Sequence, residues 1–100
     1  MVLMNLGVIM NKNEPKKQLQ LILQSKLSEL RNELGLSQEE FANLIGKSRQ
    51  MVSLYERGEL LLSWETCLAI VAVAVNRDEN VLTNIYGDAF LKDFQHEIQK

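Results

Sequence analysis

The sequence predicts an all-α protein, a bundle of five or six helices. Apolar residues recur at steps of three and four along most of the chain, which is the repeat of an amphipathic helix. One proline and five glycines leave few interruptions. The balance of 46% apolar and 24% charged residues is that of a folded chain, and 100 residues suffice for one domain and little more.

The first ten residues, MVLMNLGVIM, are apolar and uncharged, yet they lack a basic start and are too short to span a membrane. Three interpretations stay open for them: an extension upstream of a true start at Met10, a disordered arm, or an edge strand that pairs with a partner chain. Residues 11–17 are polar and basic, and we expect a solvated linker there. Residues 1–14 are therefore assigned to a flexible or alternative N-terminal arm.

The first helix is expected to begin near Pro15 and to end at Gly35, because proline suits an early helical position and glycine a helix end. The leucines of its buried face repeat at steps of four, four, three and four: Leu19, Leu23, Leu27, Leu30 and Leu34. The pattern indicates a single helix of about five turns. We expect its first turns, around Leu19 to Leu23 with Ile22 beside them, to cover the core; the alternative is that these turns extend a dimer contact.

Two short helices joined by a tight turn are predicted between Ser37 and Gly58. Ser37 can cap the first of them, and Glu40 three residues later completes a capping box. Leu36 just outside this helix and Phe41 one turn inside it form the matching hydrophobic staple.

The turn between these helices carries residues that suit a steep helix crossing. Gly46 ends the first helix, since glycine adopts the left-handed conformation, and Ser48 caps the second. Ala42 leaves room at the crossing, which Val52 fills. The residues expected to face inward are Phe41, Leu44 and Ile45 in the first helix and Val52 and Tyr55 in the second. This is the arrangement of a helix-turn-helix.

The second helix keeps an outward face of Arg49, Gln50, Ser53 and Leu54. Arg49 and Gln50 lie in its first turn, the part that enters a DNA major groove when such helices dock. An arginine fork can donate two hydrogen bonds to guanine, and a glutamine can pair with the adenine edge. Ser48 and Ser53 are candidates for a phosphate or base contact.

The segment QEEFANLIGKSRQMVSLYERG resembles the helix-turn-helix core of the xenobiotic-response-element (XRE) type, the lambda-repressor-like DNA-binding domains of phage repressors and Cro proteins. The resemblance extends from about Leu27 to Val75. It rests on the S-Q-E-E opening, the A-x-x-x-G spacing of Ala42 and Gly46, and the V-S-x-Y-E-x-G run. It implies a lambda-repressor-like bundle over residues 15–86 that regulates transcription, as a repressor, by binding double-stranded DNA. The expected form is a homodimer on a two-fold symmetric site, cytoplasmic and associated with the nucleoid.

By its position in the family motif, Gln38 is expected to contact a phosphate at the start of the first helix. Lys47 in the turn can reach the DNA backbone, and Leu54 can touch a thymine methyl group or cover a partner surface. Glu56 is assigned a structural role, in which its carboxylate ties the end of the second helix to nearby backbone or basic groups. The candidate DNA-binding residues are Gln38, Lys47, Ser48, Arg49, Gln50, Ser53, Leu54 and Arg57.

The net charge of −2 is unevenly distributed. It is +2 over residues 1–20, zero over 21–58 and −4 over 59–100, which add to the total. Affinity for DNA depends on charges close to phosphates, so a small basic face on a mildly acidic domain can still bind. We expect modest non-specific binding, and tight binding only from a dimer.

The loop after Gly58 departs from the family pattern. It carries Glu59 and three leucines, Leu60 to Leu62, where relatives usually carry basic residues and a proline. These leucines favour a protein interface. Since XRE-type domains recur as antitoxins that sequester a toxin and repress their own operon, an antitoxin or adaptor that binds a partner protein is the alternative function.

Three further helices are expected, with Ser63, Asp78 and Asp88 as their caps. The first is apolar on most sides, which suits the centre of a bundle. The apolar residues are Trp64, Cys67, Leu68, Ile70, Val71 and Val75 in the first, Val81, Leu82, Ile85 and Tyr86 in the second, and Phe90, Leu91, Phe94 and Ile98 in the third. The third, in the C-terminal segment 87–100, places Lys92, Asp93, Gln95 and Glu97 opposite and lies outside the resemblance.

No enzymatic activity, cofactor or metal site is expected. Cys67 is the only cysteine and His96 the only histidine, so an intramolecular disulfide or a cysteine-rich zinc site cannot form. The sequence has no glycine-rich phosphate loop and no histidine paired with serine or cysteine at a usable spacing. Cys67 is expected to act as a small buried apolar side chain.

Overall fold

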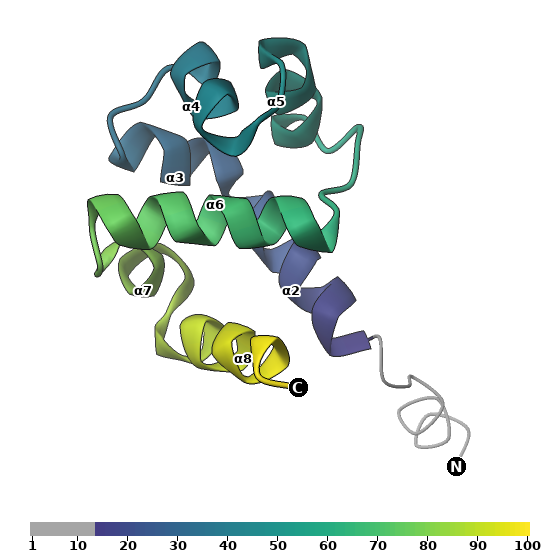
Figure 1. The fold of residues 1–100 in the computed structure, drawn as a ribbon, viewed down its shortest axis with the longest axis vertical. Coiled ribbons are helices and arrows are strands. Elements are labelled where there is room, and N and C mark those ends of the chain that lie inside the picture. The colour runs from purple at the N-terminus through teal and green to yellow at the C-terminus, as the bar shows by residue number, and fades with distance from the viewer. Residues whose placement is uncertain (1–13) are drawn as a thin grey trace.

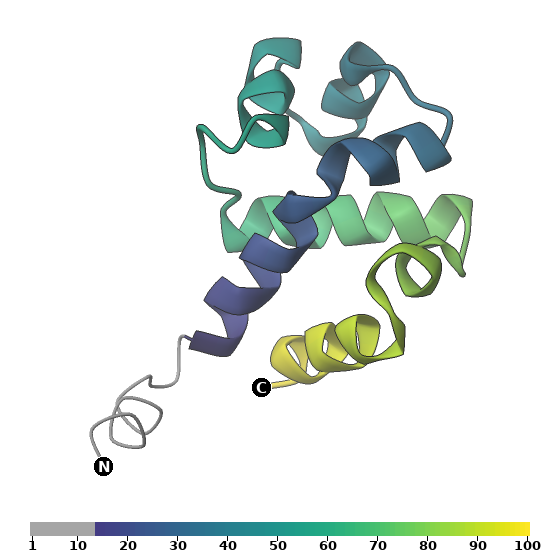
Figure 2. The same cartoon turned by 180° about the vertical axis from the view of Figure 1, so that it is seen from behind.

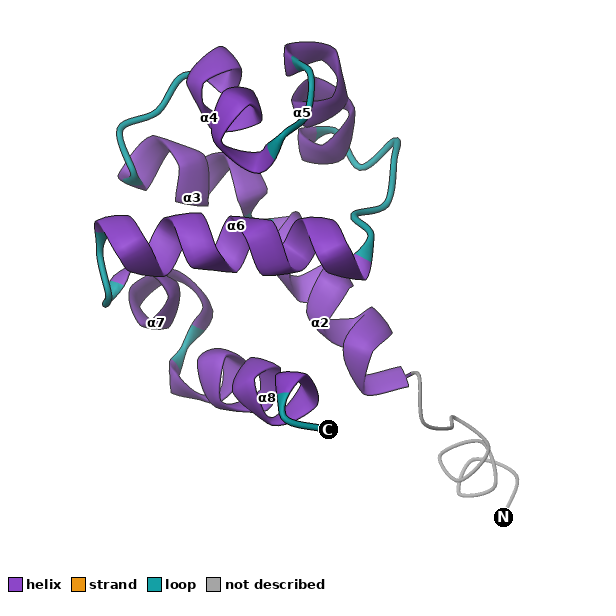
Figure 3. Cartoon of the chain, in the orientation of Figure 1, coloured by secondary structure: helices purple, strands orange, loops and turns teal. Residues whose placement is uncertain are grey.

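The computed structural model describes residues 14–100 of the chain, and this part is helical throughout, with no strand (Figure 3). Its helices are α2 (Glu14–Ser25), α3 (Leu27–Glu33), α4 (Gln38–Ile45), α5 (Arg49–Glu56), α6 (Trp64–Arg77), α7 (Val81–Tyr86) and α8 (Asp88–Ile98). The all-α prediction is confirmed. The expectations for residues 1–10, and for the linker as far as residue 13, lie outside the described residues.

The described chain has seven helices where five or six were expected, because the predicted first helix is divided in two. Lys26 lies between α2 and α3 with φ −127° and ψ 29°, outside the helical conformation. Next to it, the hydroxyl of Ser25 donates to the carbonyl of Ile22 at 2.6 Å, and the Lys26 ammonium donates to the carbonyl of Ile85 at 3.2 Å. A serine that bonds back to the preceding turn competes with the helical ladder and bends the chain.

The helices form layers around α6, which crosses the middle of the molecule (Figure 1). Both views place α4 and α5 on one side of α6 and α7 and α8 on the other (Figures 1 and 2). Helices α2, α4 and α7 all pack against α6. These contacts bury α6 from several directions, as its apolar composition predicted. Val75 was among the apolar residues of this helix, but it is 38% exposed.

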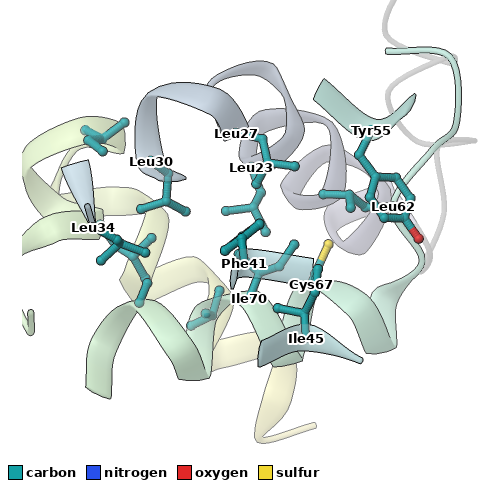
Figure 4. Close-up of a cluster of buried hydrophobic side chains, with 14 of the residues drawn as sticks. Leu23, Leu27, Leu30, Leu34, Phe41, Ile45, Tyr55, Leu62, Cys67 and Ile70 are labelled. Atoms are coloured by element: carbon teal, nitrogen blue, oxygen red, sulfur yellow. The ribbon is translucent and has the colours of Figure 1, made fainter. Parts of the chain in front are cut away.

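The core forms where leucines of the first two helices meet α4 and α6. All five leucines of the predicted stripe are buried, and Figure 4 shows several of them beside Phe41 and Ile70. The first turns of α2 therefore cover the core, as expected, while Ile22 stays 43% exposed. Cys67 is fully buried, and this burial raises the pKa of its thiol to about 12, as suits a small apolar side chain.

Two of the three caps expected in the C-terminal half are wrong. Ser63 does cap α6, where its hydroxyl oxygen accepts from the Thr66 N–H at 3.1 Å. Asp78 instead accepts from the N–H of Asn80 at 3.0 Å, a local turn that delays the start of α7. Asp88 is the first residue of α8 and does not cap it; Gly87, with φ 95°, precedes it.

The buried face of α8 is rotated from the predicted one. Phe90 and Phe94 are buried as expected, but Ile98 is 53% exposed and Glu97 is buried. Because α8 packs against α2 as well as α7, positions 90, 94 and 97, which are one turn apart, form its inner stripe. Glu97 keeps one oxygen on Lys100 at 3.1 Å. The rings of Phe94 and Trp64, 4.8 Å apart, join α8 to the start of α6.

Candidate nucleic-acid interface

The start of α4 is fixed by the predicted capping box. The hydroxyl oxygen of Ser37 accepts from the N–H of Glu40 at 3.0 Å, and the carboxylate of Glu40 accepts from the N–H of Ser37 at 2.8 Å. The backbone bond, and after it the bond to the Ser37 side chain, hold the pKa of Glu40 below its usual value. Leu36 and Phe41, the two residues of the predicted staple, are both buried.

The turn that sets the angle between α4 and α5 has the predicted geometry. Gly46 has φ 71°, a left-handed conformation that glycine adopts without strain, and the N–H of Lys47 donates to the carbonyl of Ala42 at 2.9 Å. Ser48 caps α5 by accepting from the N–H of Met51 at 3.1 Å. The side chains of Ala42 and Val52 are buried, with exposed fractions of 1% and 0%.

Leu44 was predicted to face inward, and this is wrong. Its side chain is 49% exposed, whereas Phe41, Ala42 and Ile45 form the buried face of α4. Helix α4 packs on both α5 and α6, and those contacts fall on the side of Ala42. The described residues leave about half of the Leu44 side chain exposed.

A chain of polar side chains holds both ends of α5. The guanidinium of Arg31 in α3 donates two hydrogen bonds to the carboxylate of Glu56, at 2.6 Å and 3.2 Å. Two parallel bonds of this kind make an arginine–carboxylate pair stronger than a single bond does. The amide of Gln38 donates to the same carboxylate at 3.0 Å. The amide oxygen of Gln38 then accepts from Arg49 at 3.4 Å. Glu56 at the end of α5 is thereby connected to Arg49 at its beginning.

The structural role expected for Glu56 is confirmed, but its main partner was missed. Arg31 also donates to the carbonyl of Leu36 at 2.9 Å, so that it links α3, the connection to α4, and α5. The side chains of Arg31 and Glu56 are only 14% and 8% exposed. Their separation of 25 residues left no periodic signal in the sequence.

The predicted contact residues lie on one side of the helix pair. Arg49, Gln50, Ser53, Leu54 and Arg57 line one shallow hollow. Arg49, Gln50 and Arg57 are exposed, while Ser53 and Leu54 are half-buried.

The other three predicted contact residues adjoin this hollow. Gln38 is half-buried and bonded to Arg49. Lys47 and Ser48 occupy the turn just before α5. The hydroxyl of Ser48 accepts as a cap, and a serine hydroxyl that accepts at its oxygen still has a hydrogen to donate.

The charge of this surface follows from the pairing. Burial of Glu56 against Arg31 removes one carboxylate from the solvent-facing side of α5. Arg57 pairs with Glu59 at 3.3 Å, but both side chains are more than half exposed, so the pair is weak. Arg49, Arg57 and Lys47 therefore supply the positive charge at and beside the hollow.

The loop after α5 corrects one further prediction. Leu62 was grouped with two neighbouring leucines as interface residues, but it is fully buried, beside Tyr55 (Figure 4). Its N–H donates to Gln24 and its carbonyl accepts from Gln20, both in α2. Leu60 and Leu61 stay exposed at 37% and 42%.

Comparison with known proteins agrees with this architecture. Residues 27–73 match a family model described as Helix-turn-helix, close to the range over which the resemblance was found. The match runs from α3 into α6 and contains the whole α4–α5 unit. Neither the curated proteins nor the solved structures give a match. None of the helices in residues 14–100 has the length and apolar content that crossing a membrane requires.

Proposed function

From the membership of residues 27–73 in the XRE-type helix-turn-helix family of DNA-binding transcription regulators, we propose that the protein recognises a specific DNA sequence with α5. It acts as a repressor in the cytoplasm, on the nucleoid. It binds as a homodimer, and each copy places its α5 in the major groove of one half of a two-fold symmetric operator. The two recognition helices then lie about 34–36 Å apart, one turn of the duplex.

One observation carries this proposal: Arg49 and Gln50 are both exposed in the first turn of a helix that is otherwise fixed. Val52 and Tyr55 anchor the inner side of α5 in the core. The Arg31–Glu56 pair anchors its end. A recognition helix held in this way loses little freedom on binding, which favours affinity and specificity.

The exposed side chains suit the donor and acceptor pattern of the major groove. Arg49 can donate two hydrogen bonds to a guanine, and Gln50 can both donate to and accept from an adenine; each such pair contributes roughly 1–3 kcal/mol of discrimination. The hydrogen bond that Arg49 donates to the amide oxygen of Gln38 favours one orientation of Arg49 before DNA arrives. Ser53 and Leu54, one turn further along, extend the contact to neighbouring bases.

The remaining candidates position the domain on the phosphates. Lys47 and Ser48 precede α5, Gln38 begins α4, and Arg57 follows α5. Such contacts fix register and orientation without reading sequence. The net charge of −2 keeps non-specific binding modest, so that two bound copies supply the affinity.

The test is a binding-site selection on random duplexes, followed by substitution of Arg49. Arg49→Ala is expected to weaken binding to the selected duplex by about 1–3 kcal/mol, relax preference at one base pair, and change binding to random DNA less. Lys92→Ala, which removes an exposed charge from α8, is the matched control and should bind like wild type. Equal losses on selected and random DNA would contradict direct readout by Arg49.

A second function, antitoxin or adaptor, is favoured by an apolar surface on α6 and α8. The residues of this surface, which carry no charge, are Leu68, Val71, Ala72, Val75, Leu91, Phe94, Gln95 and Ile98. It lies across α6 from α4 and α5 (Figure 1), so a partner protein there leaves α5 accessible. Co-expression with the product of the adjacent gene tests this function. A stable complex that Ile98→Lys disrupts supports it, and a homodimer that binds DNA without retaining that product contradicts it.

A further inference from the structure

The loop that follows α5 is held in one conformation by two glutamines of α2. Gln24 donates to the carbonyls of Tyr55 at 2.9 Å and Leu60 at 2.7 Å, and its amide oxygen accepts from the N–H of Leu62 at 3.1 Å. Gln20 donates to the carbonyl of Leu62 at 2.6 Å. Three hydrogen bonds to the loop, one to the last turn of α5, and the buried side chain of Leu62 thus fix a loop that has no helix of its own.

This fixed loop exposes apolar side chains next to another exposed leucine. Leu60 and Leu61 are 37% and 42% exposed, and Leu21 of α2 is 49% exposed. Leu21 and Leu61 line the same hollow. Contact with another molecule would bury these side chains at little cost in conformational entropy, because the loop is already ordered.

We propose that Leu21, Leu60 and Leu61, flanked by Arg57 and Glu59, form the surface through which two copies of this chain meet on DNA. This surface is called the loop patch below. The inference rests on the proposed function, because it identifies the contact that the DNA-bound homodimer uses.

The charges beside the loop patch are self-complementary. Arg57 and Glu59 lie 3.3 Å apart, and their side chains are 57% and 58% exposed. In a two-fold contact the same surface meets itself, so Arg57 of one copy approaches the partner's Glu59, and the reverse pair forms with it. A second copy therefore offers both the apolar and the charged complement of this patch.

The position of the loop patch also fits the spacing of the DNA. Helix α5 has eight residues and is about 12 Å long, and the loop begins at its end. In a two-fold contact with the end of α5 directed at the axis, half of a side-by-side contact adds about 5 Å, which would place Arg49 about 17 Å from that axis. The two copies of Arg49 are then about 34 Å apart, the spacing of adjacent major-groove faces.

The apolar surface on α6 and α8 does not meet this requirement. Helix α8 lies on the far side of α6 from α5 in both views (Figures 1 and 2). A two-fold contact through α8 adds the thickness of two further helix layers per copy, about 8–10 Å for each layer. The recognition helices would then be too far apart for adjacent half-sites.

The size of the loop patch indicates when the contact forms. A stable interface buries about 800 Å² on each partner over about 20–30 residues, which is much more than these five residues supply. We therefore expect monomers free in solution. Two adjacent half-sites on DNA raise the effective concentration of the second copy and so allow the contact to form.

Cysteine cross-linking on DNA tests the contact directly. Leu61→Cys is expected to give a disulfide-linked dimer on a duplex with two symmetric half-sites, and none on a duplex with one. Ile98→Cys, which replaces an apolar residue of α8 that is at least as exposed as Leu61, should give none on either. The native Cys67 does not interfere, because it is fully buried. Cross-linking by Ile98→Cys instead, or by neither variant with two copies bound, would overturn the inference.

Leu61→Lys provides an independent measurement. It should leave affinity for one half-site unchanged and lower affinity for the symmetric duplex on the order of 100-fold, because the cooperative gain is lost. Unchanged cooperativity would overturn the inference while the proposed function stands. Failure of the wild type to bind any selected duplex would instead overturn the proposed function. The two failures are therefore distinguishable.

Discussion

Substituting Glu56 with alanine should both destabilise the fold and loosen the recognition helix. The substitution leaves the guanidinium of Arg31, which is 14% exposed, without its carboxylate. Removal of one partner from a buried ion pair costs about 3–5 kcal/mol. Because Arg31 keeps its bond to the carbonyl of Leu36, we expect the lower end, about 3 kcal/mol.

Urea denaturation followed by circular dichroism measures this cost as a loss in the free energy of unfolding. Thermal unfolding measures it as a lower midpoint. At about 4–8 °C per kcal/mol for a domain of this size, that midpoint should fall by about 12–24 °C. The control is Glu59→Ala, which breaks the exposed pair with Arg57 and should cost about 0–1 kcal/mol. If the two substitutions cost the same, the buried pair does not support α5 as described.

A double variant separates stability from orientation. Arg31→Met combined with Glu56→Leu replaces the buried pair by apolar side chains, a change that is often neutral for stability. It also removes the carboxylate that accepts from Gln38, whose other end holds Arg49. We expect stability to recover but specific DNA binding to stay weakened. Full recovery of binding would show that the bond through Gln38 does not orient Arg49.

Four further predictions concern single positions. Ser37→Ala should cost about 1 kcal/mol by urea denaturation, because it removes the cap of α4. Leu44→Lys should change stability by less than about 0.5 kcal/mol, because this side chain is 49% exposed. Phe94→Ala should cost about 3–5 kcal/mol, since Phe94 is fully buried in the core. The pKa of Cys67 is raised from 9.0 to about 12, so the unfolded chain ionises first; relative to Cys67→Ala, stability should fall as pH rises above 9.0.

Local signals in the sequence were sufficient for the caps and the turn of the α4–α5 unit. Ser37, Gly46 and Ser48 act on backbone groups within four residues, so their roles follow from sequence order alone. The same logic was wrong at Asp78 because an aspartate can close a turn before a helix as readily as it can cap one. Local signals thus predict that a helix is present, and they predict its first residue less reliably.

The periodic spacing of apolar residues predicted which side chains are buried better than it predicted whether a helix is unbroken. The leucine stripe of the first helix is buried along its whole length, yet the helix is broken at Lys26. The steps of four and three remain valid on both sides of the break, because α2 and α3 present the same stripe to the core. Hydrophobic spacing therefore could not reveal the division into two helices.

Which face of a short helix is buried depends on neighbours that the sequence does not order. Leu44 and Ile98 were expected to face inward because they stand at helical spacing from Phe41 and Phe94, which are buried. The actual choice was made by α5 crossing at Ala42 and by α2 lying along α8. An apolar stripe on a helix of two or three turns locates the centre of the buried face only to within about one residue, which is about 100° of rotation about the helix axis.

The support of the recognition residues was the least predictable part of the site. Arg49 and Gln50 follow from their place in the first turn of α5, whereas Arg31 has no local motif and acts through tertiary contact alone. If α5 reads DNA as proposed, we expect a substitution at Arg31 to alter that recognition through Glu56, without any contact between Arg31 and DNA. Under the proposed function, base specificity is therefore expected to depend on the buried Arg31–Glu56 pair as well as on Arg49 and Gln50.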